Sequence, residues 1–309
     1  MNIKDLKYLV AIADHSHFGK AAAACFVSQP ALSMQIKKLE NFLDVQLIER
    51  NKSALLTDVG KLITEQARDI LCRVDAIKQM ARQAKDPFGG ELRLGVIPTL
   101  GAYLLPHIIP GLSKIFPKLT IYLVEEKTHT LIDKLKNGKL DGALFGLPIL
   151  EEDFMALPLF AEEILLAVPS NHPFAKRSKI KYSDLENKTL LLLEDGHCLR
   201  DQALSLCHSM HASVDTVFQA TSLETLRYMI ASKTGITLMP KLACKNNEGI
   251  CYIPFNLPKP VRTIGMIWRP SSAKKILLEN MVVHIRKLLG KKQIVKILNT
   301  SIICHKNKI

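Results

Sequence analysis

In the N-terminal part of the chain, hydrophobic residues recur at intervals of three and four, the spacing of amphipathic helices. This pattern predicts helices over residues 3–14, 18–25 and 29–43. Ser28 is a good N-cap for the third helix, and Pro30 is tolerated in a first helical turn. The turn between the second and third helices is short, so the segment has the layout of a helix-turn-helix.

The third predicted helix has two unlike faces. Leu32, Ile36 and Leu39 form an inward stripe, while small polar and basic side chains project from the other side. Such a helix can lie in the major groove, with polar side chains on base edges and lysines on phosphates. The predicted DNA-binding residues are Ser28, Gln29, Pro30, Ser33, Gln35, Lys37, Lys38 and Arg50. An ordinary three-helix bundle with a solvated face has the same pattern, so the pattern alone leaves both interpretations open.

A wing and a long helix are predicted to follow. Residues 47–48 and 55–56 form two short apolar strands around a basic tip, and Thr57 then caps a helix of about 26 residues, roughly 39 Å long. Its apolar positions alternate spacings of four and three: Ile63, Ala67, Ile70, Val74, Ile77, Ala81 and Ala84. One small domain cannot bury so long a heptad seam, and we therefore expect it to pair with a second copy of the chain.

Beyond a Pro- and Gly-containing linker, strand and helix patterns alternate. Strands are expected at residues 92–96, 120–124 and 142–145, and helices at 103–115 and 131–135. A second unit of this kind extends over residues 163–267, and a final helix over 273–289. This alternation predicts mostly parallel sheets with helices on both faces, arranged as two α/β lobes with a ligand cleft between them.

The predicted fold class is α+β overall, with a separate N-terminal head. We place a winged helix-turn-helix at residues 1–58, a dimerisation helix at 59–85, a hinge at 86–90, a two-lobed regulatory domain at 91–290 and a basic tail at 291–309. The tail pattern is compatible with a short amphipathic helix, although a solvated segment is the simpler expectation.

The most informative chemistry lies between residues 190 and 211. Gly196 ends an apolar run, and a helical pattern follows that places Cys198 near a helix start and Cys207 on the same helix. A thiol at a helix N-terminus, with His197 before it and Arg200 after it, has surroundings that lower its pKa. Cys198 is therefore the candidate reactive residue.

The spacing of these two cysteines limits what they can do. Nine residues of unbroken helix separate Cα atoms by about 13.5 Å, whereas a disulfide tolerates at most about 7 Å. A bond between Cys198 and Cys207 therefore requires the helix to unravel, which makes such a bond a conformational switch. The alternative is that both are inert, because cysteines are often simply small buried apolar residues.

Composition narrows the class of protein. The chain has 309 residues, 48% of them hydrophobic, without the roughly 18-residue apolar run of a membrane span or a signal-peptide pattern. We expect a cytoplasmic protein with no membrane partner, and no cofactor or metal. Seven scattered cysteines do not resemble a secreted disulfide framework. The net charge of +13 favours a polyanionic partner, yet residues 1–90 carry only +3 of it and residues 259–309 carry +11.

The N-terminal motifs resemble those of LysR-type transcriptional regulators. The resemblance is carried by F-G-K-A-A-A (18–23), S-Q-P-A-L-S (28–33), I-K-K-L-E (36–40), L-I-E-R (47–50) and L-T-D-V-G (56–60). The chain departs from the usual pattern at Gly19-Lys20 and at Asn51-Lys52. The resemblance implies a DNA-binding regulator and not an enzyme, with an effector domain similar to periplasmic binding proteins.

Within this family, the effector domain is similar to hydrogen peroxide sensors. The matching segments include I-P-T-L-G-A-Y-L-L-P (97–106), L-E-D-G-H-C-L-R-D-Q-A (193–203) with Cys207, A-T-S-L-E-T-L-R (220–227) and R-T-I-G (262–265). The resemblance implies that peroxide oxidises Cys198 to a sulfenic acid and that Cys207 resolves it as a disulfide. Thr99, Thr128 and Asp201 would bind or orient peroxide, and Arg269 would be the positively charged neighbour of the thiol.

The resemblance also implies partners. They are promoter operator DNA, hydrogen peroxide, RNA polymerase and further copies of the chain in a homodimer or homotetramer, with oxidative-stress genes activated. Three other functions stay open: an ordinary regulator that senses a metabolite, a thiol peroxidase enzyme, and a regulator that binds metal through His197, Cys198, Cys207, His208 and His211. Cys244 and Cys251 are more consistent with incidental thiols than with a second switch.

Overall fold

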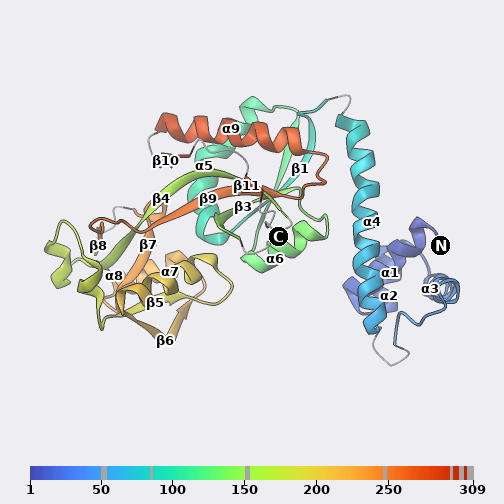
Figure 1. The fold of residues 1–309 in the computed structure, drawn as a ribbon, viewed down its shortest axis with the longest axis horizontal. Coiled ribbons are helices and arrows are strands. Elements are labelled where there is room, and N and C mark those ends of the chain that lie inside the picture. Colours follow the sequence, from blue (N-terminus) through green and yellow to red (C-terminus); the bar gives the residue numbers. More distant parts are fainter. Residues whose placement is uncertain are drawn as a thin grey trace. The chain divides into compact units, whose positions relative to one another are not determined.

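The chain folds into two compact units, Met1–Arg82 and Gln83–Ile309 (Figure 1). The computed structural model describes residues 1–49, 54–83, 86–149, 154–245, 249–292, 295–298 and 303–304. In the described part of the chain, no helix is long and apolar enough to cross a membrane.

The head is a helix-turn-helix built from α1 (Ile3–His15), α2 (Phe18–Ala24) and α3 (Gln29–Leu43). Leu9 and Ile12 of α1 pack against Leu32 of α3 in a fully buried core, as the apolar spacing predicts. The Ser28 hydroxyl accepts a hydrogen bond from the Ala31 N–H at 3.4 Å, which confirms Ser28 as the N-cap of α3.

The predicted strands of the wing pair with each other. Ile48 and Leu56 form an antiparallel bridge, and the Thr57 N–H donates to the Leu47 carbonyl at 3.0 Å. The Glu40 carboxylate accepts hydrogen bonds from the N–H groups of Leu47 and Ile48, at 2.8 and 3.2 Å, which ties the wing to the end of α3. Arg50, at the predicted basic tip, lies outside the described residues.

The long helix α4 spans Asp58–Gln83, and the Thr57 hydroxyl accepts a hydrogen bond from the Gly60 N–H at 2.9 Å, as expected of a cap. The first turns of α4 belong to the head, where Ala67 is buried. Farther along, Ile70 is 41% exposed and Ile77 is 66% exposed. The second half of the predicted seam is therefore open to solvent in the single chain.

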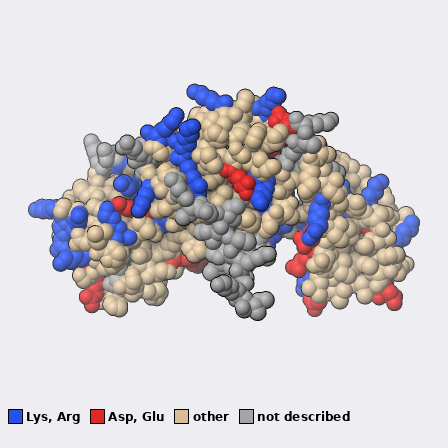
Figure 2. Space-filling view, turned by 45° about the horizontal axis from the view of Figure 1, so that its top comes forward, with Lys and Arg blue, Asp and Glu red and all other residues tan. Residues whose placement is uncertain are grey.

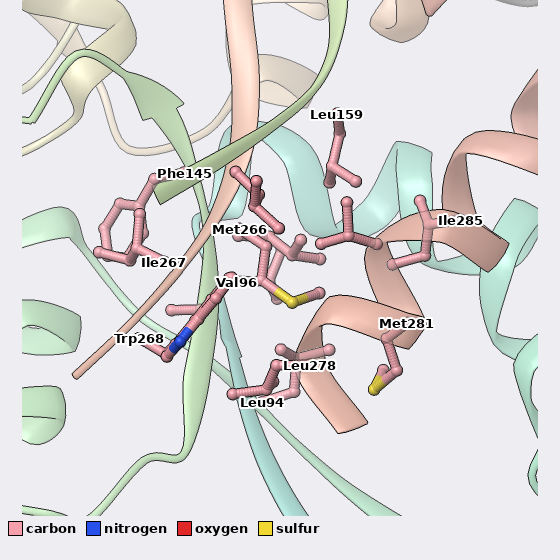
Figure 3. Close-up of a cluster of buried hydrophobic side chains, with 14 of the residues drawn as sticks. Leu94, Val96, Phe145, Leu159, Met266, Ile267, Trp268, Leu278, Met281 and Ile285 are labelled. Carbon is pink, nitrogen blue, oxygen red and sulfur yellow. The ribbon is translucent and has the colours of Figure 1, made fainter. Parts of the chain in front are cut away.

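Lobe I of the regulatory unit has a mixed sheet. The strands β1 (Gly90–Val96), β2 (Leu119–Glu125) and β3 (Gly142–Leu147) are parallel, with β1 in the middle. The helices α5 (Pro98–Ile115), α6 (Thr128–Lys136) and α9 (Lys275–Lys292) complete the lobe. Figure 3 shows Trp268 and Met266 together with Leu94 of β1 and Leu278 of α9 in the lobe I core.

Lobe II is reached through one long strand, β4 (Met155–Pro169). Its first half pairs antiparallel with β9 (Val261–Trp268) in lobe I, and from Ile164 it pairs with β7 (Thr237–Pro240) and β8 (Ile250–Ile253). The rest of lobe II is a parallel pair, β5 (Thr189–Leu193) and β6 (Ser213–Ala220), with α7 (Cys198–Met210), α8 (Leu223–Ala231) and 3-10 turns at Pro173–Lys176, Tyr182–Leu185 and Lys241–Ala243.

The predicted two-lobed α+β fold is confirmed, but two of its details are wrong. Strands β4 and β9 carry the chain out of lobe I and back into it, so they run antiparallel and the sheets are more mixed than expected. In the tail, β10 (Lys296–Ile297) and β11 (Ile303–Cys304) pair antiparallel with β4. These residues form neither the amphipathic helix nor the solvated segment that the pattern suggested.

Candidate functional site

The two candidate cysteines share one helix but belong to different cores. Helix α7 is unbroken from Cys198 to Met210, and both thiols are free. Cys198 is half-buried and packs against the lobe I core, whereas Cys207 is 2% exposed in the lobe II core. The prediction that both lie on one helix is confirmed. Helix geometry keeps residues nine apart too distant for a disulfide while α7 is intact.

The Cys198 sulfur lies against the backbone of β3. A Cβ added to Gly146 would be 3.2 Å from Cys198 Sγ and 3.2 Å from Gln202 Nε2. Gly146 therefore leaves the space that the thiol and the Gln202 amide occupy. The sequence pattern indicates no role for Gly146 or Gln202, although Gln202 follows Cys198 by one helical turn.

Polar atoms without partners lie in the segments around the thiol. Among the described residues, Thr128 Oγ1, His197 Nε2 and Gln202 Oε1 are buried and have no hydrogen-bond partner. Buried polar atoms in proteins nearly always have one. The Thr128 N–H donates to the Gly196 carbonyl at 3.2 Å, which brings the N-terminus of α6 to the turn before Cys198. The site therefore offers unused donors and acceptors to a small hydroxylic molecule.

His197 is a predicted thiolate-activating residue at the N-terminus of α7. It is 3% exposed, and burial together with the charge of Lys127 lowers its pKa below the usual 6.5. The lowered pKa favours the neutral imidazole, which can donate or accept a hydrogen bond. The role of His197 beside Cys198 stays a prediction.

Arg200 is a predicted thiolate-activating residue, and Asp201 is a predicted peroxide ligand. The Arg200 guanidinium donates to the Leu193 carbonyl, and its Nε lies 2.8 Å from Asp195 Oδ1. These contacts fasten the turn that precedes α7. Asp201 is exposed on the first turn of α7.

A buried cation, Arg262, contacts the predicted peroxide ligand Thr99. Arg262 belongs to the R-T-I-G segment, but the sequence pattern indicates no role for it. Its Nη1 donates to Thr99 Oγ1 at 3.3 Å and its Nη2 to the Thr99 carbonyl at 3.2 Å. Its Nε donates to Glu162 Oε1 at 2.6 Å, and Glu162 Oε2 accepts from the Leu242 N–H at 3.0 Å. Thr99, Glu162 and Arg262 are all buried.

Arg269 contacts the C-terminal end of α6. Its Nη1 donates to the carbonyls of Leu135 and Leu140, where α6 ends. Thr128 and the turn before Cys198 meet at the other end of that helix. A helix C-terminus is a favourable position for a cation. The role of Arg269 as the positively charged neighbour of the thiol stays a prediction.

The head presents most of the predicted DNA-binding set on one exposed face. Six of the eight residues are exposed: Ser28, Gln29, Pro30, Ser33, Lys37 and Lys38. Gln35 is half-buried, and its Nε2 donates to Asp5 Oδ1 at 2.6 Å, so its amide fastens α3 to α1. On the side of the molecule shown in Figure 2, lysine and arginine side chains lie in separate groups between large uncharged areas.

Other cysteine and histidine combinations receive little support. Within the described residues, no three His, Cys, Asp or Glu side chains are placed to hold a metal ion. Burial raises the pKa of the Cys244 thiol to about 12, and its sulfur lies 3.4 Å from the Pro240 carbonyl. Such a thiol forms little thiolate, which favours the interpretation of Cys244 as incidental.

Comparisons with known proteins agree with this arrangement. The model of the bacterial regulatory helix-turn-helix protein, lysR family, matches residues 3–61, and the LysR substrate binding domain model matches residues 85–289. The DNA-binding transcriptional dual regulator OxyR of Escherichia coli (strain K12) is 49% identical over 290 residues, covering 93% of this chain and 95% of that protein.

Solved structures named OxyR share the fold. A full-length OxyR variant from Pseudomonas aeruginosa matches with a TM-score of 0.79 and 35% identity, covering 97% of this chain and 99% of that chain. The oxidised and reduced forms of OxyR match with a TM-score of 0.62 each, at 46% and 45% identity. They cover 67% and 66% of this chain, and 99% and 98% of their own. The chain belongs to the LysR family of bacterial helix-turn-helix transcriptional regulators.

Proposed function

We propose that this regulator senses hydrogen peroxide by reversible disulfide formation between Cys198 and Cys207 and thereby controls transcription of oxidative-stress genes. The observation that carries the proposal is the placement of the two thiols on one unbroken helix, in the cores of different lobes. Relatives named OxyR, solved in oxidised and reduced forms, support a redox switch in this arrangement.

The proposed chemistry has two steps. The Cys198 thiolate attacks one oxygen of hydrogen peroxide; the O–O bond breaks, a sulfenic acid forms and the departing hydroxide takes a proton to leave as water. The Cys207 thiol then attacks the sulfenic sulfur, a disulfide forms and a second water leaves. Two thiols are oxidised and one peroxide is reduced.

Residues around Cys198 would hold the peroxide. Thr128 Oγ1 and the Gln202 amide have buried, unused hydrogen-bonding capacity, and Thr99 is held by Arg262. We propose that Arg262 fixes the Thr99 hydroxyl for contact with peroxide, and that Arg269 supplies the positive charge that favours the thiolate and the departing hydroxide. His197, as a neutral imidazole, would supply a donor or an acceptor but no charge.

The second step forces a change of shape. Cys207 has to leave the lobe II core and α7 has to unravel, because about 13.5 Å of helix must shrink to at most about 7 Å. We propose that this change alters the packing between regulatory units in a homotetramer and so the spacing of the DNA-binding heads. The proposed setting is the cytoplasm, with promoter DNA and RNA polymerase as the partners of the activating form.

Mass spectrometry of thiol-labelled protein, before and after a brief stoichiometric peroxide pulse, tests this proposal. The expected result is a Cys198–Cys207 disulfide within seconds in the wild type, none in Cys198→Ser, and an unchanged yield in the matched control Cys251→Ser. Oxidation of other cysteines while Cys198 and Cys207 stay free would contradict peroxide sensing and leave only the family assignment.

A further inference from the structure

The Phe26 side chain on the head is almost fully exposed to solvent, although phenylalanine side chains are usually buried. Phe26, in the turn between α2 and α3, is 96% exposed, whereas its neighbours Cys25 and Val27 pack against the core of the head. The Phe26 N–H donates to the Ala23 carbonyl at 3.1 Å, and the Val27 N–H donates to the Ala22 carbonyl at 3.0 Å. The turn is therefore anchored on both sides, and its ring is held in solvent.

The backbone of Phe26 is also unusual for its residue type. Its φ is +57°, in the left-handed region that favours Gly, Asn and Asp. The other non-glycine residues with positive φ in the described chain are Ser16, Asp44, Asn187, His211 and Lys233, so Phe26 is the large apolar one among them. Asn or Gly would suit this turn better, and the folded head gains no packing from the ring. A residue that breaks a local rule in this way often serves a function.

The position of the ring indicates what it touches. Phe26 is two residues before Ser28, the N-cap of α3, and three and four residues before the exposed Gln29 and Pro30 in the first turn of that helix. In a helix-turn-helix the N-terminal residues of the second helix contact base edges in the major groove. A ring held beside them therefore meets the same groove, where the C5-methyl of thymine is the apolar feature that a phenylalanine side chain can recognise.

We propose that Phe26 is a specificity-determining residue that packs on the C5-methyl group of a thymine in each operator half-site. This inference rests on the DNA-binding function of the head and is independent of peroxide sensing. The contact removes an exposed apolar ring and a methyl group from water, which favours thymine over every base without that methyl.

The experiment uses DNA that the full-length protein selects itself from a random-sequence library. Enrichment by the wild type tests DNA binding, and its failure would remove the basis of the proposal. Each thymine of the enriched duplex is then replaced singly by deoxyuridine, which deletes only the methyl group. The wild type should bind about fourfold more weakly at one thymine per half-site, the factor that about 0.8 kcal/mol for a buried methyl gives.

Two variants identify the group that senses the methyl. Phe26→Ala and Phe26→Asn should bind the thymine duplex more weakly and lose all sensitivity to uracil at that position. The control is Phe42→Ala, which removes a ring that is 66% exposed near the other end of α3. This variant should retain the sensitivity to uracil. The thermal midpoint of Phe26→Asn should equal or exceed that of the wild type, because Asn accepts the left-handed turn.

Three results would overturn the proposal. Equal weakening of every duplex by Phe26→Ala, with no uracil-sensitive thymine in the wild type, would place the ring on the sugar-phosphate backbone. Unchanged DNA binding with loss of transcriptional activation would indicate that the Phe26 ring contacts another protein. A lower thermal midpoint of Phe26→Asn would give the ring a structural role in the free head.

Discussion

At the scale of single residues, the absence of a side chain at position 146 is as important as the thiol itself. Any Cβ there would meet Cys198 Sγ and the Gln202 amide at 3.2 Å, closer than ordinary van der Waals contact. The space that the Cys198 sulfur occupies depends on this glycine.

We expect Gly146→Ala to slow the oxidation of Cys198 by peroxide roughly tenfold, corresponding to about 1.4 kcal/mol in the barrier. The measurement is the second-order rate of sulfenic acid formation by stopped flow in a Cys207→Ser background. Gly290→Ala is the control, because its added Cβ would have only an ordinary contact at 3.7 Å with Ile297. An unchanged rate in Gly146→Ala would show that the thiol does not depend on this space.

Glu162 and Arg262 form a buried ion pair, with side chains 0% and 1% exposed. Removing one partner of such a pair leaves an uncompensated buried charge, at a cost of about 3–5 kcal/mol. Glu162→Ala should therefore lower the free energy of unfolding by about that amount, measured by urea denaturation. Glu163→Ala is the matched control, because the Glu163–Lys259 pair is partly exposed and a surface pair contributes about 0–1 kcal/mol. Equal losses in the two variants would contradict the structural role of the buried pair.

His197 gives the stability a specific pH dependence. Burial lowers its folded-state pKa below 6.5, so the unfolded chain binds a proton that the folded chain excludes. Stability contributed by His197 is therefore complete above about pH 6.5 and falls as the pH decreases toward the folded-state pKa. His197→Asn should flatten this decline between pH 7 and 5.5 in urea titrations. His172→Asn, which removes another histidine whose pKa burial lowers, gives the size of an ordinary histidine effect for comparison. A decline of the same slope in His197→Asn and wild type would contradict the assignment.

The sequence predicted the reactive thiol but not its full surroundings. Cys198 and Cys207 were found because a cysteine pair on one helix has a spacing that can be read directly. Arg262 and Arg269 lie seven residues apart in the sequence, and the pattern contains nothing that says which guanidinium turns toward Thr99. That choice is made by Glu162, which is a hundred residues away along the chain and meets Arg262 only after folding.

At the scale of elements, α4 has a heptad seam that a single chain cannot bury completely. Its seam is buried near the head at Ala67 and exposed at Ile70 and Ile77. The exposed half of the helix is consistent with pairing between two copies, because solvated apolar positions at heptad spacing gain stability by burial in a coiled coil.

A charge in this seam should separate the copies. We expect Ile77→Glu to convert the assembly to monomers at micromolar concentration, as measured by analytical ultracentrifugation. Glu65→Lys places a charge change on another face of the same helix and should leave the assembly intact. An Ile77→Glu protein of unchanged mass would contradict pairing through α4.

The secondary structure predicted from the sequence was accurate where a hydrophobic pattern repeated over many residues. It failed where a short strand depends on pairing with a strand that is distant in the sequence. Helices α1, α3 and α4 agree closely with their predicted ranges. The tail strands β10 and β11 are two residues each, too short to show a period, and they exist because β4 offers an edge for pairing. The extent of the wing likewise depends on Glu40, an α3 residue that no strand pattern includes.

At the scale of the whole molecule, α7 carries two cysteines that pack in different lobes. Cys198 belongs to lobe I by its packing and Cys207 to lobe II, so a disulfide between them changes contacts in both lobes at once. The turn before α7 is fastened to the start of α6 through Thr128 and through the ion pair of Lys127 with Glu194. Loss of α7 would therefore be transmitted to the start of α6 in lobe I.

The central claim is that the Cys198–Cys207 disulfide cannot form without unravelling α7, and hydrogen exchange of the α7 backbone amides tests this most directly. In the full-length protein, peroxide should abolish the protection of amides in residues 198–210 and leave α9 protected. In Cys207→Ser, which can form the sulfenic acid but not the disulfide, α7 should stay protected after the same treatment. A Cys198–Cys207 disulfide formed with α7 protection unchanged would contradict the account.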